Sequence, residues 1–293
     1  MSCMDDKNVV MRLIEARDAY RNRLANVFST NEIDFYFKSV LRGCLDIDPL
    51  DLALKPNLEL LPFQQDMIND TLEAFLEEKP LQYILGEIHF RNIALHVNPL
   101  VLIPRPETEE LVEWIIEDYK DLSREISVVD FGTGSGCIAL TLKKEQPFFS
   151  VCAVDLDKPI LDLVQENAQK NKLQIATLQF DIIELDQLDL EVELIVSNPP
   201  YICPSEKKEM KKNVLEYEPH QALFVPENDP LLFYRHILNF ASRQLKPKGK
   251  IYFEINPRYV VDLEYLILSF SDYRVTKRLD IFGKTRMLRI EKQ

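Results

Sequence analysis

Glycine is scarce in this sequence: the chain of 293 residues contains only seven. Three of the seven, Gly132, Gly134 and Gly136, fall within five consecutive residues. Glycine has no side chain to keep neighbours away, and it adopts left-handed backbone conformations at little cost. We therefore expect the backbone at residues 132–136 to pass close to another group.

Cysteine and histidine are too scattered to indicate a disulfide framework or a metal site. The five cysteines are Cys3, Cys44, Cys137, Cys152 and Cys203. Their number is odd and no two form a C-x-x-C pair, so we expect reduced thiols in a cytoplasmic protein. The four histidines are also spread along the chain, and nothing brings three ligands together, so no metal is expected.

No hydrophobic run approaches the roughly 18 residues that a membrane-spanning helix needs. The first stretch, MSCMDDKNVVMRLIEARDAY, is charged throughout and lacks the apolar core of a signal peptide. We therefore expect neither membrane insertion nor export.

Positive charge is also in deficit, with 35 Lys and Arg residues against 48 Asp and Glu and a net charge of −13. Proteins that grip nucleic-acid phosphates usually carry basic clusters on one face. The dense basic run EKKEMKK (206–212) is interrupted by Glu206 and Glu209. We interpret it as a solvated helix face, with a docking patch for an acidic partner as the alternative. Direct nucleic-acid binding is therefore not expected.

The length suits one large domain plus a smaller one, and 46% hydrophobic residues can bury a substantial core. Residues 1–85 are predicted to form a small helical bundle, because 31–48 and 64–85 carry apolar residues three and four apart. From residue 86 the period changes to two, so 86–105 are predicted as a β-hairpin linker that turns at Arg91-Asn92.

Residues 106–293 alternate between helix and strand patterns. The predicted helices are 106–119, 136–146, 158–171 and 229–245, and the predicted strands are 126–131, 150–155, 175–180, 192–197 and 250–255. Residues 273–292 are predicted as two antiparallel strands around a turn at Gly283. The predicted fold class is α/β: a doubly wound, Rossmann-like sheet with an antiparallel C-terminal hairpin, preceded by the helical bundle.

The glycine cluster lies in VVDFGTGSGCIAL (128–140), between a predicted strand and a predicted helix. Backbone N–H groups at such a helix start point at a bound ligand. The spacing is G-x-G-x-G rather than the dinucleotide pattern G-x-G-x-x-G, and a purely structural turn is the alternative. The candidate cofactor residues here are Gly132, Thr133, Gly134, Ser135 and Gly136.

Acidic residues end the next two strands. Asp155 lies about 20 residues past the last glycine, where a carboxylate accepts both hydroxyls of a ribose. Asp181 can accept from an exocyclic amine while the N–H of Ile182 meets a ring nitrogen. Asp130 either anchors the glycine turn or meets an amino group. Each acid alone is more often an ordinary strand end, but together they favour S-adenosyl-L-methionine, an adenosine with an amino-acid tail and no phosphates.

The fourth predicted strand ends in LIVSNPPYI (194–202), where two prolines remove two N–H donors and leave the Pro199 carbonyl rigid and free to accept. With the Asn198 side-chain carbonyl, it can hold both hydrogens of a planar NH₂ group while Tyr201 stacks on that group. Such a grip aims the nitrogen lone pair at a methyl group and stabilises the positive charge that develops. A strand-terminating Asn-Pro turn is the alternative.

With these motifs the chain resembles the glutamine methyltransferases of peptide chain release factors, the HemK/PrmC family. The similar stretches cover most of the chain: QYILGEIHF, VLIPRPETEELVE, VVDFGTGSGCIAL, AVDLD, LIVSNPPYI, YEPHQAL and DIFGKTR. N-P-P-Y alone is shared with amino-methyltransferases of DNA and RNA bases, whereas LIPRPETE is far more specific to the release-factor enzymes. The chain departs from the family in 224–234 and at Asn256, where glycines are usual.

The resemblance implies methyl transfer from S-adenosyl-L-methionine to the side-chain amide nitrogen of the glutamine in the Gly-Gly-Gln motif of release factors, its protein partners. It implies cofactor contacts from residues 132–136, Asp155, Asp181, Ile182 and Asn198. It also implies that the glutamine is held by Asn198, Pro199, Pro200 and Tyr201, of which Asn198, Pro199 and Tyr201 are catalytic. Residues 1–85 would help to dock the release factor, and 106–293 would form the methyltransferase domain.

Two other hypotheses stay open from the residues alone. An amino-methyltransferase acting on an exocyclic amine of DNA or RNA would use the same chemistry, but it requires a basic groove. A non-catalytic nucleotide-binding protein would tolerate Asn198→Ala without loss of methyl transfer. Arg105 either reaches the active site or bridges to an acid. Cys203 has no base partner in the sequence pattern and is expected to be an inert thiol.

Overall fold

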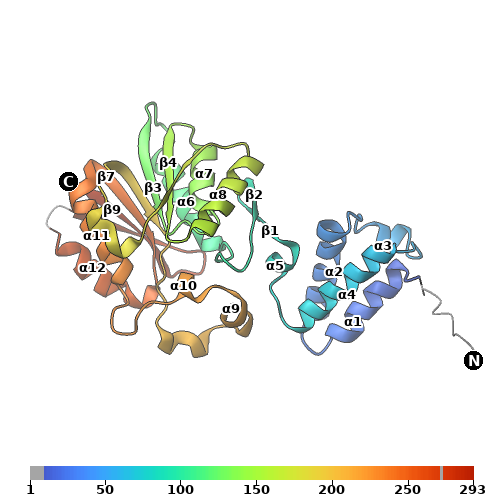
Figure 1. The fold of residues 1–293 in the computed structure, drawn as a ribbon. Coiled ribbons are helices and arrows are strands. Elements are labelled where there is room, and N and C mark those ends of the chain that lie inside the picture. The colour runs from blue at the N-terminus through green and yellow to red at the C-terminus, as the bar shows by residue number, and fades with distance from the viewer. Residues whose placement is uncertain (1–9, 271–272) are drawn as a thin grey trace, which may run out of the picture. The chain divides into compact units, whose positions relative to one another are not determined.

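The computed structural model describes residues 10–270 and 273–293 (Figure 1). Contacts between residues divide the chain into two compact units, one ending at Gly86 and the other beginning at Glu87. Each unit has a hydrophobic core of its own. Cys3, one of the predicted free thiols, lies outside the described residues.

The first unit is a bundle of helices. They are α1 (Leu13–Leu24), α2 (Thr30–Cys44), α3 (Asp51–Leu54), α4 (Pro62–Leu76) and α5 (Leu81–Leu85). The helical pattern of 64–85 is divided between α4 and α5, because Pro80 lacks the N–H that would continue a helix and instead precedes the first turn of α5. The core lies between α1, α2 and α4, where the Tyr20 hydroxyl bonds Thr71 Oγ1 at 2.5 Å.

The second unit begins with the antiparallel hairpin β1 (Glu87–Phe90) and β2 (Ile93–His96). The side chain of Phe90 is buried in the same core as the helices and strands that follow. The Arg91 guanidinium, in the hairpin turn, pairs with Glu145 at 2.8 Å. The hairpin predicted from the period-two pattern therefore packs as part of the second unit.

A seven-stranded sheet forms the centre of the second unit, in the order β5-β4-β3-β6-β7-β9-β8. The strands are β3 (Ile126–Phe131), β4 (Phe149–Asp155), β5 (Ala176–Gln179), β6 (Val192–Ser197), β7 (Leu245–Glu254), β8 (Tyr273–Leu279) and β9 (Thr285–Lys292). Strands β3 to β7 are parallel, and β8 and β9 pair antiparallel beside them. The chain passes from β3 outward to β4 and β5 and then crosses to β6 on the other side of β3. The strand order thus reverses between β3 and β6, which is where open α/β sheets bind ligands.

Helices cover both faces of this sheet (Figure 1). The longer helices are α6 (Pro106–Asp118), α7 (Cys137–Glu145), α8 (Lys158–Lys170), α11 (Leu232–Gln244) and α12 (Val260–Leu268). Helices α6, α7 and α8 share one core cluster with the sheet, and α11 and α12 share the other. The doubly wound sheet, its antiparallel C-terminal hairpin and the preceding helical unit confirm the predicted fold class.

Short helices that the sequence patterns did not predict connect the main elements. They are the 3₁₀ helices η1 (Ile182–Gln187), η2 (Pro204–Glu209) and η3 (Pro257–Tyr259) and the helices α9 (Lys212–Tyr217) and α10 (His220–Leu223). The basic run 206–212 spans the end of η2 and the start of α9. Glu206 in it is buried and accepts the Cys203 N–H at 2.9 Å, so this run is not a uniformly solvated face.

Candidate functional site

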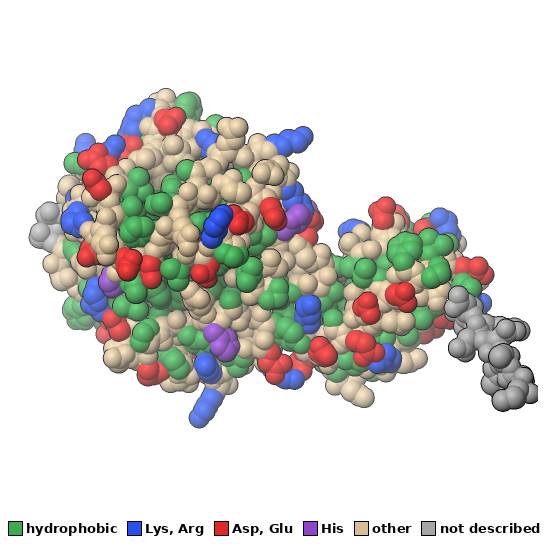
Figure 2. All heavy atoms as spheres, viewed as in Figure 1, with side chains coloured by type: hydrophobic (Ala, Val, Ile, Leu, Met, Phe, Trp, Pro, Cys, Tyr) green, Lys and Arg blue, Asp and Glu red, His purple; other side chains and the backbone are tan. Residues whose placement is uncertain are grey.

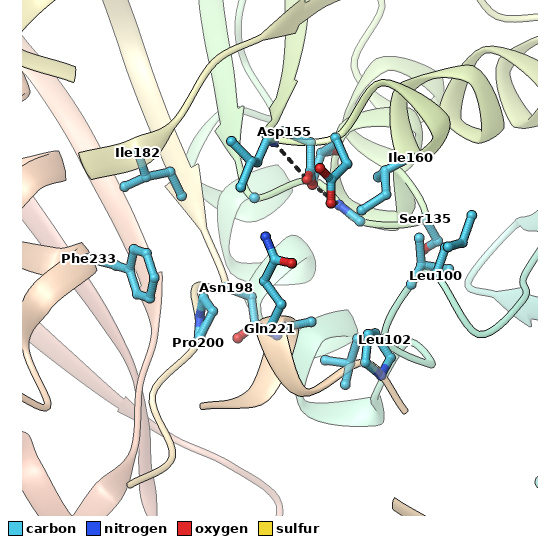
Figure 3. A pocket seen from close by; sticks show the side chains of 18 of the residues that line it. Leu100, Leu102, Ser135, Asp155, Ile160, Ile182, Asn198, Pro200, Gln221 and Phe233 are labelled. Carbon is cyan, nitrogen blue, oxygen red and sulfur yellow. Dashed lines mark hydrogen bonds between the residues drawn. The ribbon is translucent and has the colours of Figure 1, made fainter. Parts of the chain in front are cut away.

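A pocket of about 320 Å³ lies at the carboxyl ends of the parallel strands, where the strand order reverses (Figure 3). The segments after β3, β4, β5 and β6 contribute to its wall, together with the segment before α6 and the start of α11. The residues singled out from the sequence that line it are Arg105, Gly132, Thr133, Gly134, Ser135, Asp155, Asp181, Ile182, Asn198 and Pro200. The fold therefore collects at one place residues that are distant in sequence.

The glycine turn after β3 has left-handed backbone at all three glycines, with φ of 71° at Gly132, 53° at Gly134 and 80° at Gly136. A Cβ atom at Gly134 would have no heavy atom within 4 Å, which leaves the backbone there open to the pocket. Gly136 differs, because a Cβ there would meet Leu140 and Val164 at 3.2 Å. Gly136 is not part of the pocket wall; it starts α7.

Asp155 ties the glycine turn to the end of β4. Its carboxylate accepts the Gly134 N–H at 3.0 Å and the Leu156 N–H at 2.9 Å, and Figure 3 shows it at the pocket wall. Burial raises the pKa of Asp155, and the backbone N–H groups act against that rise because they stabilise the charged form. At the end of β5, Asp181 accepts the Ile183 N–H at 3.0 Å and so starts η1.

Asp130 lies fully buried beneath the turn, where its Oδ2 accepts the Thr133 hydroxyl at 2.7 Å. Burial raises the pKa of Asp130 to about 7. Its Oδ1 and the hydroxyl of Ser135 are buried without a hydrogen-bond partner among the residues that the structure describes. Ser135 lines the pocket and Asp130 does not. Buried polar atoms are normally paired, so the unpartnered Ser135 hydroxyl suits a ligand with polar groups, such as the amino-acid tail expected from the sequence.

Asn198 follows β6 and faces the pocket from the side opposite the glycine turn (Figure 3). Its amide N–H donates to Thr108 Oγ1 at 3.3 Å, and the Thr108 hydroxyl donates to Glu254 Oε2 at 2.6 Å. At the other end of the motif, the Tyr201 hydroxyl donates to Glu254 Oε1 at 3.0 Å. Asn256 Nδ2 donates to the Tyr201 carbonyl at 3.1 Å.

Two acceptors of the motif stay available. The structure gives no hydrogen bond, among its described residues, to the Pro199 carbonyl or to the amide oxygen of Asn198. Tyr201 is only partly exposed, and burial raises the pKa of its hydroxyl, which keeps it protonated as a donor. The motif thus combines two free oxygen acceptors with an aromatic ring that Glu254 holds by its hydroxyl.

A second pocket of about 170 Å³ adjoins the first, and Pro199 and Tyr201 line it. Asn198 and Arg105 line both pockets, so the two cavities meet at these side chains. Arg105, whose role the sequence left open, lines both cavities and also pairs with the buried carboxylate of Glu218 at 2.5 Å. Arg105 therefore both reaches the site and forms an ion pair with an acid, the two roles that the sequence left as alternatives.

Several residues of the site were not singled out from the sequence. Gln221 extends into the first pocket, and Phe233 lines it from α11 (Figure 3). Thr108 and Glu254 hold the Asn-Pro-Pro-Tyr segment by hydrogen bonds to the side chains of Asn198 and Tyr201. Thr108 and Gln221 fall in stretches that carried the family resemblance, LIPRPETE and YEPHQAL, so the signal was present without a role attached to it.

Within residues 10–270 and 273–293, no group of three or more His, Cys, Asp and Glu side chains is placed to hold a metal ion. In the same ranges no helix combines the length and the apolar character that crossing a membrane would require.

Residues 15–86 match the PrmC N-terminal domain, and residues 109–221 match the methyltransferase small domain. The chain is 42% identical over 276 residues to the release factor glutamine methyltransferase of Flavobacterium psychrophilum, covering 94% of this chain and 97% of that protein. It is 38% identical over 271 residues to the release factor glutamine methyltransferase of Bacteroides thetaiotaomicron, covering 92% of this chain and 96% of that protein.

Among solved structures, the 16S rRNA N2 G1207 methyltransferase of Thermus thermophilus, in complex with AdoMet and guanosine, is similar with a TM-score of 0.52. It is 20% identical, and the match covers 71% of this chain and 50% of that chain. At this identity the likeness shows a shared fold.

Proposed function

The chain belongs to the family of release factor glutamine methyltransferases, and from this premise we propose that it methylates the side-chain amide nitrogen of a glutamine in a peptide chain release factor. The methyl donor is S-adenosyl-L-methionine, and the target is the glutamine of the Gly-Gly-Gln motif. One observation carries the proposal: Asn198, with a free amide oxygen, faces a pocket suited to an adenosine on one side and a smaller pocket on the other.

The larger pocket holds the cofactor, which supplies an electrophilic methyl group on a sulfonium. Asp155 would accept from the ribose hydroxyls, and Asp181 with Ile182 would meet the adenine edge. The backbone from Gly132 to Gly134 approaches the ligand closely, which the open space beside Gly134 supports. Ser135 would offer its unpartnered hydroxyl to the amino-acid tail, whereas Asp130 lies outside the pocket wall and anchors the turn through Thr133.

The smaller pocket holds the substrate glutamine. Its carboxamide donates one N–H to the Asn198 amide oxygen and the other to the Pro199 carbonyl, with Tyr201 against its flat face. Both acceptors belong to rigid groups, because proline fixes the backbone and Thr108 fixes the Asn198 amide. The nitrogen lone pair is thereby aimed toward the larger pocket.

This grip addresses the poor nucleophilicity of a carboxamide nitrogen, whose lone pair is delocalised. As the nitrogen forms a bond to the methyl carbon, the bond from that carbon to the sulfonium sulfur would break, and its electron pair would stay on the sulfur, which leaves as a neutral thioether. The nitrogen would become pyramidal and positively charged, and the two oxygen acceptors would stabilise that charge most strongly in the transition state. The methylated nitrogen then loses one proton, which water can accept. No strongly basic side chain is required.

The charge of the protein supports a protein substrate rather than a nucleic acid. The net charge is −13, and on the visible face in Figure 2 basic and acidic side chains are interspersed without a continuous basic area. The helical unit, with exposed Phe35, Leu54 and Phe63, helps to dock the release factor. We place the activity in the cytoplasm, where a release factor and reduced cysteines are expected.

The test is mass spectrometry of a release factor after incubation with the purified protein and S-adenosyl-L-methionine. We expect one methyl group on the glutamine of the Gly-Gly-Gln motif. A release factor with alanine at that glutamine should gain none. Nucleic acid incubated in parallel should also gain none; methylated nucleic acid beside an unmodified glutamine would refute the proposal.

A further inference from the structure

Both ends of the Asn198–Tyr201 segment are tied to one carboxylate. Glu254, the last residue of β7, is 1% exposed and accepts the Tyr201 hydroxyl at one oxygen and the Thr108 hydroxyl at the other. Thr108, in the first turn of α6, is 2% exposed and accepts from the Asn198 amide.

The Thr108 hydroxyl decides which way the Asn198 amide faces. A hydroxyl has one hydrogen to donate, and Thr108 gives that hydrogen to Glu254 at 2.6 Å. Toward Asn198 it therefore offers only a lone pair, which an amide N–H can bond and an amide oxygen cannot. The amide nitrogen must face Thr108, so the amide oxygen is left free for another group.

A reversed amide would defeat the proposed chemistry. Asn198 would then present an NH₂ group to the NH₂ group of the substrate glutamine, and two donors repel. Because the two orientations of an amide have nearly the same shape, sterics alone select weakly between them. A hydrogen bond of fixed direction therefore selects between the two orientations of the Asn198 amide.

We propose that Thr108 and Glu254 are positioning residues that hold the amide oxygen of Asn198 toward the substrate, with Glu254 setting the direction of the Thr108 hydroxyl and holding Tyr201 as well. This inference rests on the proposed function. Thr108 lines the larger pocket and Glu254 lines neither pocket, and we assign the effect of both residues to their bonds with Asn198 and Tyr201. The burial of both side chains makes the arrangement rigid before any ligand binds.

The test replaces the Thr108 hydroxyl and keeps its shape. Thr108→Val is nearly isosteric but can neither accept from Asn198 nor donate to Glu254, whereas Thr108→Ser retains the hydroxyl. Thr141→Val is the matched control, because Thr141 is fully buried in α7 and its hydroxyl has no hydrogen-bond partner among the described residues. For each variant, kcat on a release factor, the Kd of the cofactor by calorimetry and the thermal unfolding midpoint are measured.

We expect Thr108→Val to lower kcat by about 10- to 100-fold, the size of effect that losing one directed buried hydrogen bond produces. Its cofactor Kd should stay close to that of Thr141→Val. Its unfolding midpoint should fall below that of Thr141→Val, because Glu254 and Asn198 lose a buried partner, so kcat is compared at a temperature where both variants are folded. Thr108→Ser should keep kcat within a few-fold of the wild type. Thr108→Ala, which removes the hydroxyl without adding bulk, serves if Thr108→Val does not fold, with the same expectation.

Wild-type kcat in Thr108→Val and Thr108→Ala would overturn the inference. So would a loss of kcat that Thr108→Ser shares in full, or one matched by an equal loss of cofactor affinity. Failure of the proposed function looks different, because the wild-type protein itself would then transfer no methyl group to the release factor.

Discussion

The glycine turn after β3 and the Asn-Pro-Pro-Tyr segment after β6 line the same pocket, yet they are held by hydrogen bonds of very different sequence range. The turn is fixed within one β-α-β unit: Gly134 bonds Asp155, 21 residues away, and Thr133 bonds Asp130, three residues away. Asn198 bonds Thr108, 90 residues away, and Tyr201 bonds Glu254, 53 residues away.

This difference indicates that cofactor affinity and turnover depend on separate parts of the site. Local bonds build a turn that lines the pocket proposed for the cofactor, so changes there should alter cofactor affinity. Distant bonds orient the acceptors that are proposed to stabilise positive charge on the substrate nitrogen, so changes there should alter turnover. The predictions below test whether the two halves of the site separate in this way.

The largest effect is expected for Asn198→Ala. Removing one of two acceptors that act in the transition state should lower kcat by about 100-fold or more, as the loss of a preorganised hydrogen bond does in other active sites. The cofactor Kd should change only a few-fold. Steady-state methyl transfer and calorimetry measure the two quantities, with Asn239→Ala, an exposed change on α11, as the control. Wild-type turnover in Asn198→Ala would contradict the assignment of turnover to the segment after β6.

Asp155→Asn should give the opposite pattern. The substitution removes a charge that receives the Gly134 N–H and faces the pocket, so the cofactor Kd should rise by about 10- to 100-fold. At saturating cofactor, kcat should stay within a few-fold of the wild type. Glu166→Gln, an exposed change on α8, is the control. A loss confined to kcat would mean that the two halves are not separable.

Within the glycine turn, Gly136 and Gly134 are expected to contribute differently to stability and to cofactor binding. Gly136→Ala should destabilise the protein by about 2 kcal/mol, because a side chain at positive φ is strained and its Cβ meets Leu140 and Val164. Gly134→Ala carries only the strain and should destabilise by about 1 kcal/mol, but its methyl group projects into the pocket and should weaken cofactor binding. Urea unfolding and calorimetry distinguish them. Equal destabilisation would argue against the packing difference.

The smallest effect concerns pH. The folded-state pKa of Asp130 is raised to about 7, so between its unfolded pKa and 7 the folded state holds a proton that the unfolded state has released. Stability attributable to Asp130 therefore falls as pH rises through this window, by about 1 kcal/mol between pH 6 and 8, and levels off above it. Asp130→Asn should show a weaker decline over the same range. Parallel pH profiles of unfolding for the two proteins would contradict this assignment.

The predicted and observed elements agree best where a local sequence pattern alone determines where the element begins and ends. The predicted strands 126–131 and 192–197 have those same bounds in the structure, because continuous apolar runs end at a glycine turn and at Pro-Pro. Helix α12 and the short helices between β6 and α11 were not predicted. Those segments lack strong periodicity, and their conformation depends on contacts such as the bond from Asn256 to Glu206.

The site likewise contains residues that the sequence made recognisable and residues that only the fold brought together. Asp155 and Asn198 stood out because their residue types, at the ends of strands, carry their own chemistry. Glu254 and Thr108 are ordinary in sequence, and only the packing of α6 against β6 and β7 brings them together in the positioning role that we propose. Gly136 was grouped with the other glycines, yet it lies outside the pocket wall, and Leu140 and Val164 occupy the space that a side chain there would need.

The order of residues along the chain, taken alone, determined the α/β class, the glycine cradle and the two rigid acceptors, since each depends on neighbours within one strand, turn or helix. Which amide face Asn198 presents, and what Arg105 pairs with, was decided by the folded sheet. The physical reason is that hydrogen bonds reach only about 3 Å, and only the packing of α6 beside the neighbouring strands β6 and β7 brings Thr108, Asn198 and Glu254 within that distance.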